Sequence, residues 1–482
     1  MNKRMIAYLL GRMLTVEAVL MAPSAVLAAV YGEGDLRAFL VTMALLVLLG
    51  VPLSLRRPAN SAIFAREGFV TVALAWVLMS GFGALPMVLS GAIPSYVDAL
   101  FEMVSGFTTT GASILKEVES LPRGVLFWRS FSHWVGGMGV LVFVMAILPM
   151  SENRSMVLMR AEVPGPTASK LVPRMRDTAK ILYGTYSVMT LALIVLLLLG
   201  GMPWFDAVCH AMGTAGTGGF SVRNAGIAYY NSPYIEVVLS IFMLLFAINF
   251  NLYYLILIRR VREALKSEEL HWFLGIVAGA VLIITACVLP LYSGLGESLR
   301  HALFQVSSII STTGFATVDF ALWPVLAQEV LLVLMFVGAC AGSTGGGFKA
   351  SRVALSCKSL AAELHHLLHP RAVTTVRLDG KAVDHATITG TRNYLIGCVL
   401  ILTAVTLLIA VDGFDFTTNF SATMSCFNNI GPGLSVVGPM SNYSAYSPFS
   451  KLLLSFAMLA GRLEVFPIVL LFSPRTWRRS AS

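Results

Sequence analysis

Long apolar runs separated by short polar segments recur along the whole chain. A transmembrane helix needs about 20 apolar residues to cross roughly 30 Å of hydrocarbon. Ten runs approach that length, at 13–31, 36–53, 68–90, 125–149, 181–200, 234–258, 273–292, 325–347, 393–411 and 450–472. The pattern therefore predicts an all-α polytopic membrane protein.

The first run has features of a secretory signal peptide, since Lys3 and Arg4 precede it and small residues end it at 25–29. However, Arg12 and Glu17 interrupt the apolar stretch, and another span follows at once. A cleaved signal has a shorter apolar core. We therefore expect an uncleaved membrane helix.

Four short segments repeat one pattern around a shared glycine. They are Thr108-Thr-Thr-Gly-Ala-Ser113, Gly216-Thr-Gly-Gly-Phe-Ser221, Ser311-Thr-Thr-Gly-Phe-Ala316 and Asn428-Asn-Ile-Gly-Pro-Gly433. In each repeat a full span precedes a shorter amphipathic stretch, the glycine segment and a second span. Because the shorter stretch cannot cross a bilayer, we expect a re-entrant helix that enters from outside and continues into an extended loop.

The repeats also set the expected domain organisation. An N-terminal helix pair occupies 1–66, and four pore repeats follow at 67–180, 181–270, 271–392 and 393–482. We expect the four repeats to surround one axis in a pseudo-fourfold arrangement.

Four non-helical loops at membrane depth indicate a shared path through the protein. Such backbone is tolerated only where it is buried in protein or lines a water-filled path. A helix that enters from outside points its partially negative C-terminus inward, which favours a cation. Glycine lets carbonyl oxygens face the axis, and a ring of carbonyls can replace the hydration shell of an ion. The repeats therefore predict a pore for a monovalent cation.

Several longer motifs accompany the glycine segments. They are His133-Trp-Val-Gly-Gly-Met-Gly139, Gly213-Thr-Ala-Gly-Thr-Gly-Gly-Phe-Ser221, Ala341-Gly-Ser-Thr-Gly-Gly-Gly-Phe-Lys349 and Ala460-Gly-Arg-Leu-Glu464. With these motifs the chain resembles, over nearly its whole length, the Trk/Ktr/HKT superfamily of potassium transporters, most closely its bacterial TrkH branch.

The resemblance implies that the shared glycines form a potassium filter, with ligands from the carbonyl of each glycine and of the residue before it. The filter segments are then Thr110-Gly111-Ala112, Gly218-Gly219-Phe220, Thr313-Gly314-Phe315 and Ile430-Gly431-Pro432. In related plant transporters a serine at the first glycine goes with sodium preference, so Gly111 indicates the potassium type. Ile430 and Pro432 make the fourth segment irregular, and we expect modest selectivity.

A second glycine-rich stretch interrupts the predicted span 325–347. It comprises Gly342, Ser343, Thr344, Gly345, Gly346 and Gly347, with Lys349 shortly after. Interior glycines each cost a helix about 1 kcal/mol, so another conformation is favoured. A phosphate-binding Walker loop requires the lysine one residue earlier and a preceding strand. The resemblance implies an intramembrane gate loop below the filter; a kink for close helix packing is the alternative.

Arg462 lies near the middle of the last predicted span, where a charge costs on the order of 2.5–3.5 kcal/mol. It must face protein or water. The resemblance implies a fixed positive charge under the filter that limits cation flux. A structural ion pair is the alternative, for which Glu464, two residues further along a helix, is poorly placed.

Composition agrees with a membrane protein and explains the net charge. Only 12% of residues are charged, the mean hydropathy is +0.79, and the net charge is +9. Most of the 34 Lys and Arg residues fall on one set of alternate loops, as the positive-inside rule requires. This places both termini in the cytoplasm and removes the need for a nucleic-acid partner.

Other polar residues receive structural interpretations. The six cysteines show no Cys-x-x-Cys pair and are expected to be reduced packing residues. His365, His366 and His369 could suggest zinc, but a solvated helix face explains them better. His133, His210 and His301 are expected to be hydrogen-bonded packing residues. Acidic residues begin the short helices, where they favour the N-terminus: Asp98, Asp206, Glu297 and Asp415.

The combined interpretation is a bacterial inner-membrane potassium uptake protein that has no enzymatic activity and binds no cofactor. The resemblance implies a homodimer that works with a cytosolic TrkA-like ring binding NAD or ATP. Coupling to a proton or sodium ion stays open, as an alternative to a gated channel. The rival classes are a secondary transporter of a small organic solute, the potassium-binding subunit of a P-type pump and a membrane enzyme.

Overall fold

The computed structural model describes residues 1–55, 58, 64–139, 175–372 and 374–477, and it is predominantly helical. Within these ranges six helices are long and apolar enough to cross a membrane, and a bent pair would make a seventh. Many leucines on the outside of these helices are exposed, among them Leu48, Leu198 and Leu407, as lipid-facing side chains must be. The predicted all-α polytopic fold is confirmed.

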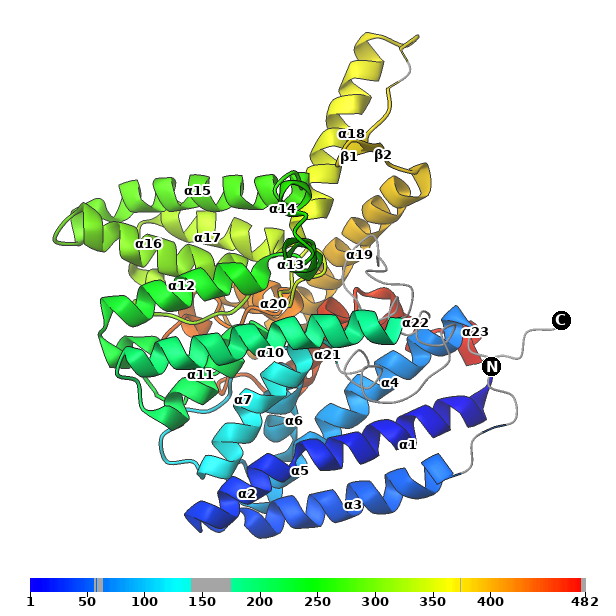
Figure 1. The fold of residues 1–482 in the computed structure, drawn as a ribbon, viewed down its shortest axis with the longest axis vertical. Coiled ribbons are helices and arrows are strands. Elements are labelled where there is room, and N and C mark those ends of the chain that lie inside the picture. Colours follow the sequence, from blue (N-terminus) through cyan, green and yellow to red (C-terminus); the bar gives the residue numbers. More distant parts are fainter. Residues whose placement is uncertain (56–57, 59–63, 140–174, 373, 478–482) are drawn as a thin grey trace.

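The N-terminal unit contains α1 (Lys3–Leu20), α2 (Ala22–Tyr31) and α3 (Leu36–Leu55). α1 and α3 lie side by side at one edge of the molecule (Figure 1). Gly11 and Gly50 face each other there, and a Cβ added to either would lie 2.8 Å from the carbonyl oxygen of the other. Small residues let membrane helices approach closely, so this pair packs backbone against backbone.

The four repeats share one order of elements: a long helix, a short helix and a second apolar helix. The long helices are α4 (Ala65–Gly83) with its extension α5 (Leu85–Leu89), α10 (Met175–Leu199), α15 (Glu268–Val288) and α19 (His385–Ile409). The short helices are α6 (Tyr96–Phe107), α11 (Trp204–Gly216), α16 (Leu295–Ile310) and α20 (Phe416–Asn428). The second helices are α7 (Arg123–Gly137), α12 (Pro233–Ala247), α17 (Val325–Val337) and α21 (Pro448–Arg462).

Short 3₁₀ turns occupy related places in several repeats. Two of them follow a long helix: η2 (Leu289–Leu291) and η4 (Ala410–Asp412). Three lie between a glycine segment and the next helix: η1 (Gly226–Tyr230), η3 (Phe320–Leu322) and η5 (Ser435–Val437). The segment after each of these glycines therefore returns to the surface through a compact turn.

The second helices are shorter than the sequence predicts. The spans expected at 234–258 and 450–472 are each broken, because α12 and α13 (Phe250–Leu257) meet at 91° and α22 (Phe466–Phe472) follows α21 only after a break. In the second break Glu464 and Val465 have positive φ values of 55° and 67°. The prediction of continuous helices was wrong here, since apolar composition alone does not reveal a change of direction. The predicted span 125–149 lies outside the described residues beyond 139.

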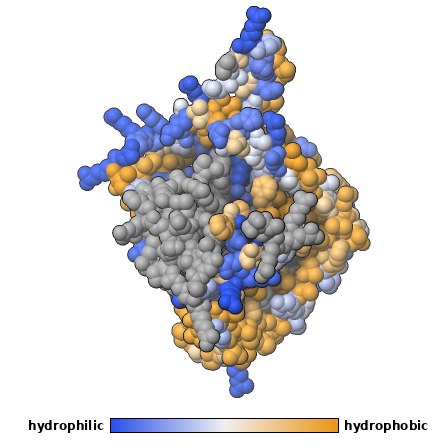
Figure 2. Space-filling model, turned by 90° about the vertical axis from the view of Figure 1, so that its right-hand side faces the viewer, coloured by the Kyte–Doolittle hydropathy of each residue, from blue (hydrophilic) through white to orange (hydrophobic). Residues whose placement is uncertain are grey.

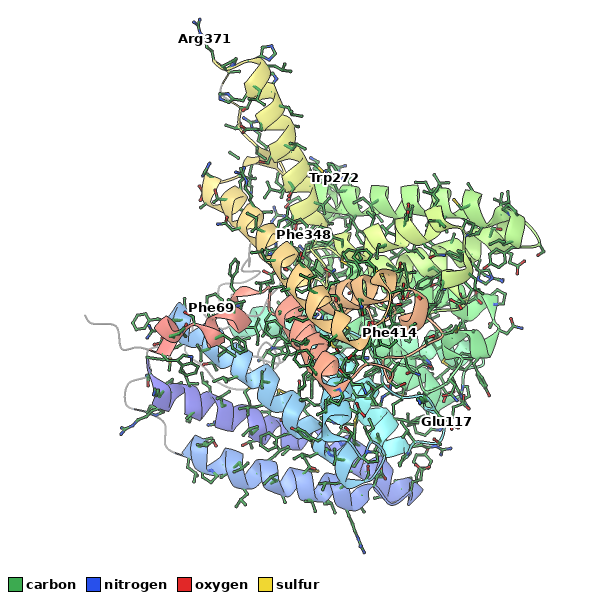
Figure 3. The ribbon with its side chains drawn as sticks, turned by 180° about the vertical axis from the view of Figure 1, so that it is seen from behind. Phe69, Glu117, Trp272, Phe348, Arg371 and Phe414 are labelled. Carbon is green, nitrogen blue, oxygen red and sulfur yellow. The ribbon has the colours of Figure 1, made fainter. Side chains whose placement is uncertain are left out.

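A part with both charged and exposed apolar side chains projects from the helical body (Figure 1). It consists of α18 (Ala350–Leu368) and a hairpin of β1 (Arg377–Leu378) and β2 (Lys381–Ala382), in which Arg377 pairs with Ala382. In Figure 3, Arg371 lies at its tip and Phe348 near its base. Figure 2 shows hydrophilic residues at the tip of this projection, apolar residues along one of its sides, and apolar residues over much of the body's margin. Two one-turn helices, α14 (Val261–Ala264) and α23 (Pro474–Trp477), complete the described chain.

Candidate functional site

Each glycine segment leaves its short helix through the same backbone geometry. The residue two places before the glycine has left-handed φ, between 56° and 62°: Thr109, Thr217, Thr312 and Asn429. The amide of the next residue donates to the carbonyl five residues back: Thr110 to Ser105, Gly218 to Gly213, Thr313 to Ser308 and Ile430 to Ser425, at 2.8–3.0 Å. The four loops are therefore structurally equivalent even where their side chains differ.

The four loops close into one ring. The shared glycines all have positive φ, from 75° to 103°: Gly111, Gly219, Gly314 and Gly431. A Cβ on each would meet the carbonyl oxygen that precedes the glycine of the next loop: Gly218, Thr313, Ile430 and, at 2.8 Å, Thr110. The contacts run from repeat 1 to 2, 3, 4 and back to 1. Only glycine satisfies both the backbone conformation and this close approach.

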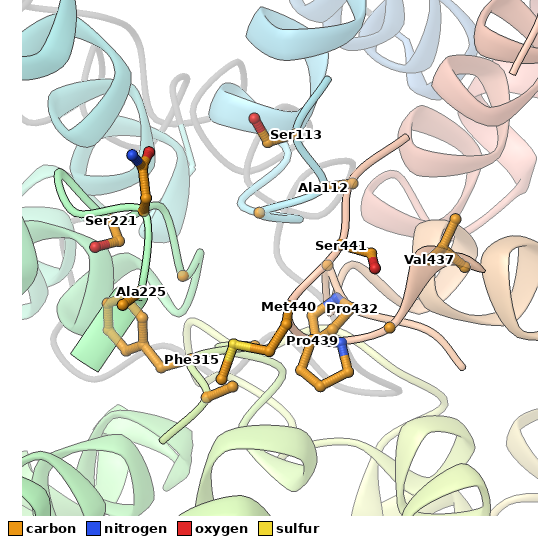
Figure 4. Close-up of a pocket in the computed structure, with 18 of the residues that line it drawn as sticks. Ala112, Ser113, Ser221, Ala225, Phe315, Pro432, Val437, Pro439, Met440 and Ser441 are labelled. Carbon is orange, nitrogen blue, oxygen red and sulfur yellow. The ribbon is translucent and has the colours of Figure 1, made fainter. Parts of the chain in front are cut away.

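The ring forms the floor of a cavity. Its lining includes the four glycines and the residues that follow them, among them Ala112, Phe315 and Pro432. Figure 4 shows loops from different repeats converging on this cavity, with Ser113, Ser221 and Ser441 among the polar residues around it. Phe220 is 2% exposed and does not line the cavity. The structure therefore brings the backbones of the predicted filter segments together. Ala112, Phe315 and Pro432 line the cavity, whereas the Phe220 side chain is buried away from it.

Side chains on the short helices brace the segments after the glycines. Nine residues before each glycine stand Glu102, His210, Gln305 and Ala422. Glu102 accepts hydrogen bonds from the Ser113 hydroxyl (2.9 Å) and the Ile114 amide (3.0 Å), and His210 bonds the Ser221 hydroxyl at 3.0 Å. Gln305 donates to the Val318 carbonyl at 3.4 Å. The equivalent position is thus filled differently in every repeat.

Two residues of α7 lie behind the ring, and sequence reasoning gave them no functional role. Arg129 pairs with Glu102 at 2.7 Å, and both side chains are buried. His133 donates from Nδ1 to the Gly106 carbonyl (2.7 Å) and accepts the Phe220 amide at Nε2 (3.3 Å). These partners require the neutral imidazole. The expectation that His133 and His210 are hydrogen-bonded packing residues agrees with the structure. The sequence offered one indication that Arg129 and His133 act together, namely that they are one helical turn apart.

The acidic residues that begin the short helices are engaged with neighbours. Asp98 pairs with Lys451 at 2.6 Å, and Asp206 with Arg223 at 2.9 Å. Asp415 accepts from the Thr418 amide and hydroxyl, and these hydrogen bonds hold the pKa of its carboxyl below the usual value. Helix capping and ion pairing account for these carboxylates.

Below the ring, the glycine-rich stretch forms an extended loop between α17 and α18. Its backbone bonds to repeat 2, where the Cys340 amide donates to the Ala247 carbonyl and the Phe250 amide to the Gly342 carbonyl, both at 3.0 Å. The Gly346 amide donates to the Thr312 hydroxyl at 2.7 Å. Gly345, Gly346 and Gly347 each lie where a Cβ would meet neighbouring atoms, and the Lys349 ammonium donates to the Gly345 carbonyl. The loop therefore packs against the segments that lead into the third and fourth glycine loops, at Thr312 and Asn428.

Arg462 connects this loop to repeat 1. Its guanidinium donates to the Thr344 carbonyl (2.9 Å) and to the carbonyls of Gly136 (2.5 Å) and Gly137 (2.9 Å). Glu464, the ion-pair partner considered from the sequence, pairs with Arg352 at 2.7 Å. Sequence reasoning also missed Glu269, whose carboxylate accepts from the amides of Ala341 (2.6 Å) and Ser351 (3.2 Å) at the two ends of the loop.

The histidines of α18 are remote from this assembly. His365, His366 and His369 are exposed, and the rings of His365 and His369 stack with centroids 4.7 Å apart. Within the described part of the chain, no group of three or more His, Cys, Asp or Glu residues could hold a metal ion. The same part of the chain contains six free cysteines, four of them buried.

The apolar spans and the backbone ring define a polytopic membrane protein of the transport class. Residues 36–479 match the TrkH family model, described as a cation transport protein. The chain therefore belongs to the TrkH family, whose members are transporters rather than enzymes.

Individual relatives match over almost their whole length. The Trk system potassium uptake protein TrkH of Halomonas elongata is 36% identical, with 99% of this chain and 100% of that protein covered. The Trk system potassium uptake protein TrkG of Escherichia coli is 34% identical over 98% and 99%. The crystal structure of the potassium transporter TrkH from Vibrio parahaemolyticus superposes with a TM-score of 0.89 at 33% identity, covering 99% and 100%.

Proposed function

We propose that this protein takes up potassium across the bacterial inner membrane through the ring of four glycine loops. The carbonyl oxygens of Thr110, Gly218, Thr313 and Ile430 and of the glycines that follow them replace the hydration shell of the ion. The closed cycle of contacts between each glycine and the next loop carries this proposal, because it forms a continuous wall of backbone at membrane depth. The names of the relatives support potassium as the ion.

The loop at 342–347 and Arg462 form the gate in this proposal. Arg462 places a positive charge beneath the ring and bonds the loop at Thr344. A cation that leaves the ring inward therefore meets both a positive charge and a packed backbone segment. Opening requires that the loop exchange its bonds to Ala247, Phe250 and Thr312 for other partners.

The proposed arrangement in the cell follows from the charge distribution and the family. Both termini lie in the cytoplasm, in agreement with the basic residues on alternate loops. The protein forms a homodimer, and a cytosolic TrkA-like ring that binds NAD or ATP regulates the gate. A membrane potential provides about 2.3 kcal/mol per charge per 100 mV, enough to drive uptake.

Ion flux into liposomes tests this function. Purified protein is reconstituted, and potassium, rubidium and sodium fluxes are compared under an imposed negative potential, first alone and then with the cytosolic partner and nucleotide. Potassium and rubidium should pass ahead of sodium, and Gly111→Ser should remove this preference. Gly32→Ser is the matched control, since Gly32 also has positive φ (66°) but nothing lies within 4 Å of an added Cβ. Equal passage of all three ions through the wild-type protein would contradict the proposal.

A further inference from the structure

Phe220, directly after the repeat 2 glycine, is enclosed by residues of repeat 1. The Arg129 guanidinium lies 4.2 Å from the centre of its ring, and the His133 ring centroid is also 4.2 Å away. The same imidazole accepts the Phe220 backbone amide. Side chain and backbone of Phe220 are therefore both held by α7.

The two residues that hold Phe220 are themselves fixed. Arg129 and His133 are four positions apart on α7 and so lie on one face of the helix. Glu102 of the repeat 1 short helix accepts from Nε of Arg129 (2.9 Å) and from its terminal nitrogen (2.7 Å). The Gly106 carbonyl of the same helix accepts from His133. Each side chain is thus held in one orientation by a buried partner.

This assembly touches both adjoining loops of the ring. Glu102 holds Ser113 and Ile114 just after Gly111, and Arg129 also approaches the Ser221 carbonyl at 3.4 Å, just after Gly219. A Cβ added to Gly218 would overlap the His133 ring, so the imidazole supports the backbone of that filter residue directly. Glu102, Arg129 and His133 therefore fix the distance between loops 1 and 2 of the ring.

We propose that Arg129 and His133 are positioning residues for ion selectivity, which clamp Phe220 and so fix the repeat 2 carbonyls relative to those of repeat 1. The inference rests on the proposed potassium filter. Neither residue reaches the ion. Their effect is to keep the ring at a width that suits potassium, because a looser ring can close around the smaller sodium ion.

The substitution Arg129→Lys separates the contact of Arg129 with the Phe220 ring from its ion pair with Glu102. Lysine keeps a positive charge for Glu102 but cannot lie flat on the Phe220 ring or donate through a planar fork. We expect the potassium-to-sodium flux ratio in liposomes to fall by about fivefold, equivalent to about 1 kcal/mol, with potassium flux much less affected. Phe220→Leu should cause a similar fall, and the double variant should fall no further than either single variant.

Arg123→Lys is the matched control. Arg123 begins the same helix, pairs with Glu33 and stacks on Tyr31 at 4.2 Å, but it is half exposed and outside the ring. Its selectivity should equal that of the wild type. A merely structural role of Arg129 would lower the melting temperature and the amount of flux while leaving the ratio unchanged. An unchanged ratio in Arg129→Lys, measured where the wild-type protein is selective, would overturn the inference; a non-selective wild type would instead overturn the proposed function.

Discussion

The ring and the loop beneath it are both glycine-rich and non-helical, but they are held in different ways. In the ring, each loop bonds to its own short helix, as Thr110 does to Ser105 and Gly218 to Gly213. The lower loop bonds to Thr312 of its own repeat, but it also depends on two other repeats, through Ala247 and Arg462. Bonds within one repeat persist when the repeats move, whereas bonds between repeats must exchange. The comparison supports the proposal that the lower loop, rather than the ring, moves when the path opens.

The largest expected effect comes from breaking the ring itself. In Gly219→Ala the new Cβ meets the Thr313 carbonyl, and left-handed φ adds about 1–2 kcal/mol of strain. We expect potassium flux in liposomes to fall more than about tenfold, since about 1.4 kcal/mol is sufficient for that factor. Gly413→Ala, with φ of 78° and open space around it, has the strain without the overlap and should keep its flux. Normal flux in Gly219→Ala would show that the ring is not the path.

Removing the charge beneath the ring should have the next largest effect, in the opposite direction. Arg462→Ala deletes the bonds to Thr344, Gly136 and Gly137 along with the charge. We expect potassium flux without a cytosolic partner to rise by up to about tenfold, as for a barrier lowered by about 1.4 kcal/mol. The control is Arg300→Ala, which breaks the ion pair to Glu236 away from the ring. If a folded Arg462→Ala protein conducts like the wild type, the arginine does not limit flux.

A smaller increase in flux should follow from loosening the loop at one point. Thr344→Val keeps the shape of the side chain but removes the hydroxyl that donates to the Phe246 carbonyl at 3.1 Å. One hydrogen bond contributes about 1 kcal/mol, so potassium flux should rise at most about fivefold. Thr403→Val removes a hydroxyl that bonds within α19 and is the matched control. Flux that falls in Thr344→Val would mean that the loop supports conduction rather than closing the path.

The smallest effect should be a pH-dependent change in stability at a helix cap. The pKa of Asp415 is lower in the folded protein, so its carboxylate stabilises the fold at neutral pH and this stabilisation is lost as pH falls through the folded pKa. Asp415→Asn should therefore lower the melting temperature slightly at pH 7 and make it less sensitive to acid below about pH 4. Identical acid sensitivity of wild type and variant would refute this role.

The parts that repeat in the sequence were predictable, and the parts that join distant segments were not. Gly111, Gly219, Gly314 and Gly431 could be found because four copies in matching context identify a common conformation. The direction change after Ala247 was missed, although Asn249 and Asn251 interrupt the apolar run there, because two polar residues alone do not specify a bend of 91°.

The same limit applies to the ion pair of Glu102 and Arg129, which are 27 residues apart on different helices. Nothing in composition or spacing relates such a pair until the two helices are packed together. The equivalent positions in the other repeats hold His210, Gln305 and Ala422, so the repeat itself gives no hint of a shared partner.

One chain supplies all four walls of the ring, and this has a genetic consequence. In an assembly of four identical subunits, any change in the gene alters every wall at once. Here a single codon alters one wall and leaves three intact. Equivalent positions in the four repeats accordingly hold four different residues: Glu102, His210, Gln305 and Ala422. A mutation can therefore change one side of the ring at a time, which is impossible in a pore built from four identical subunits.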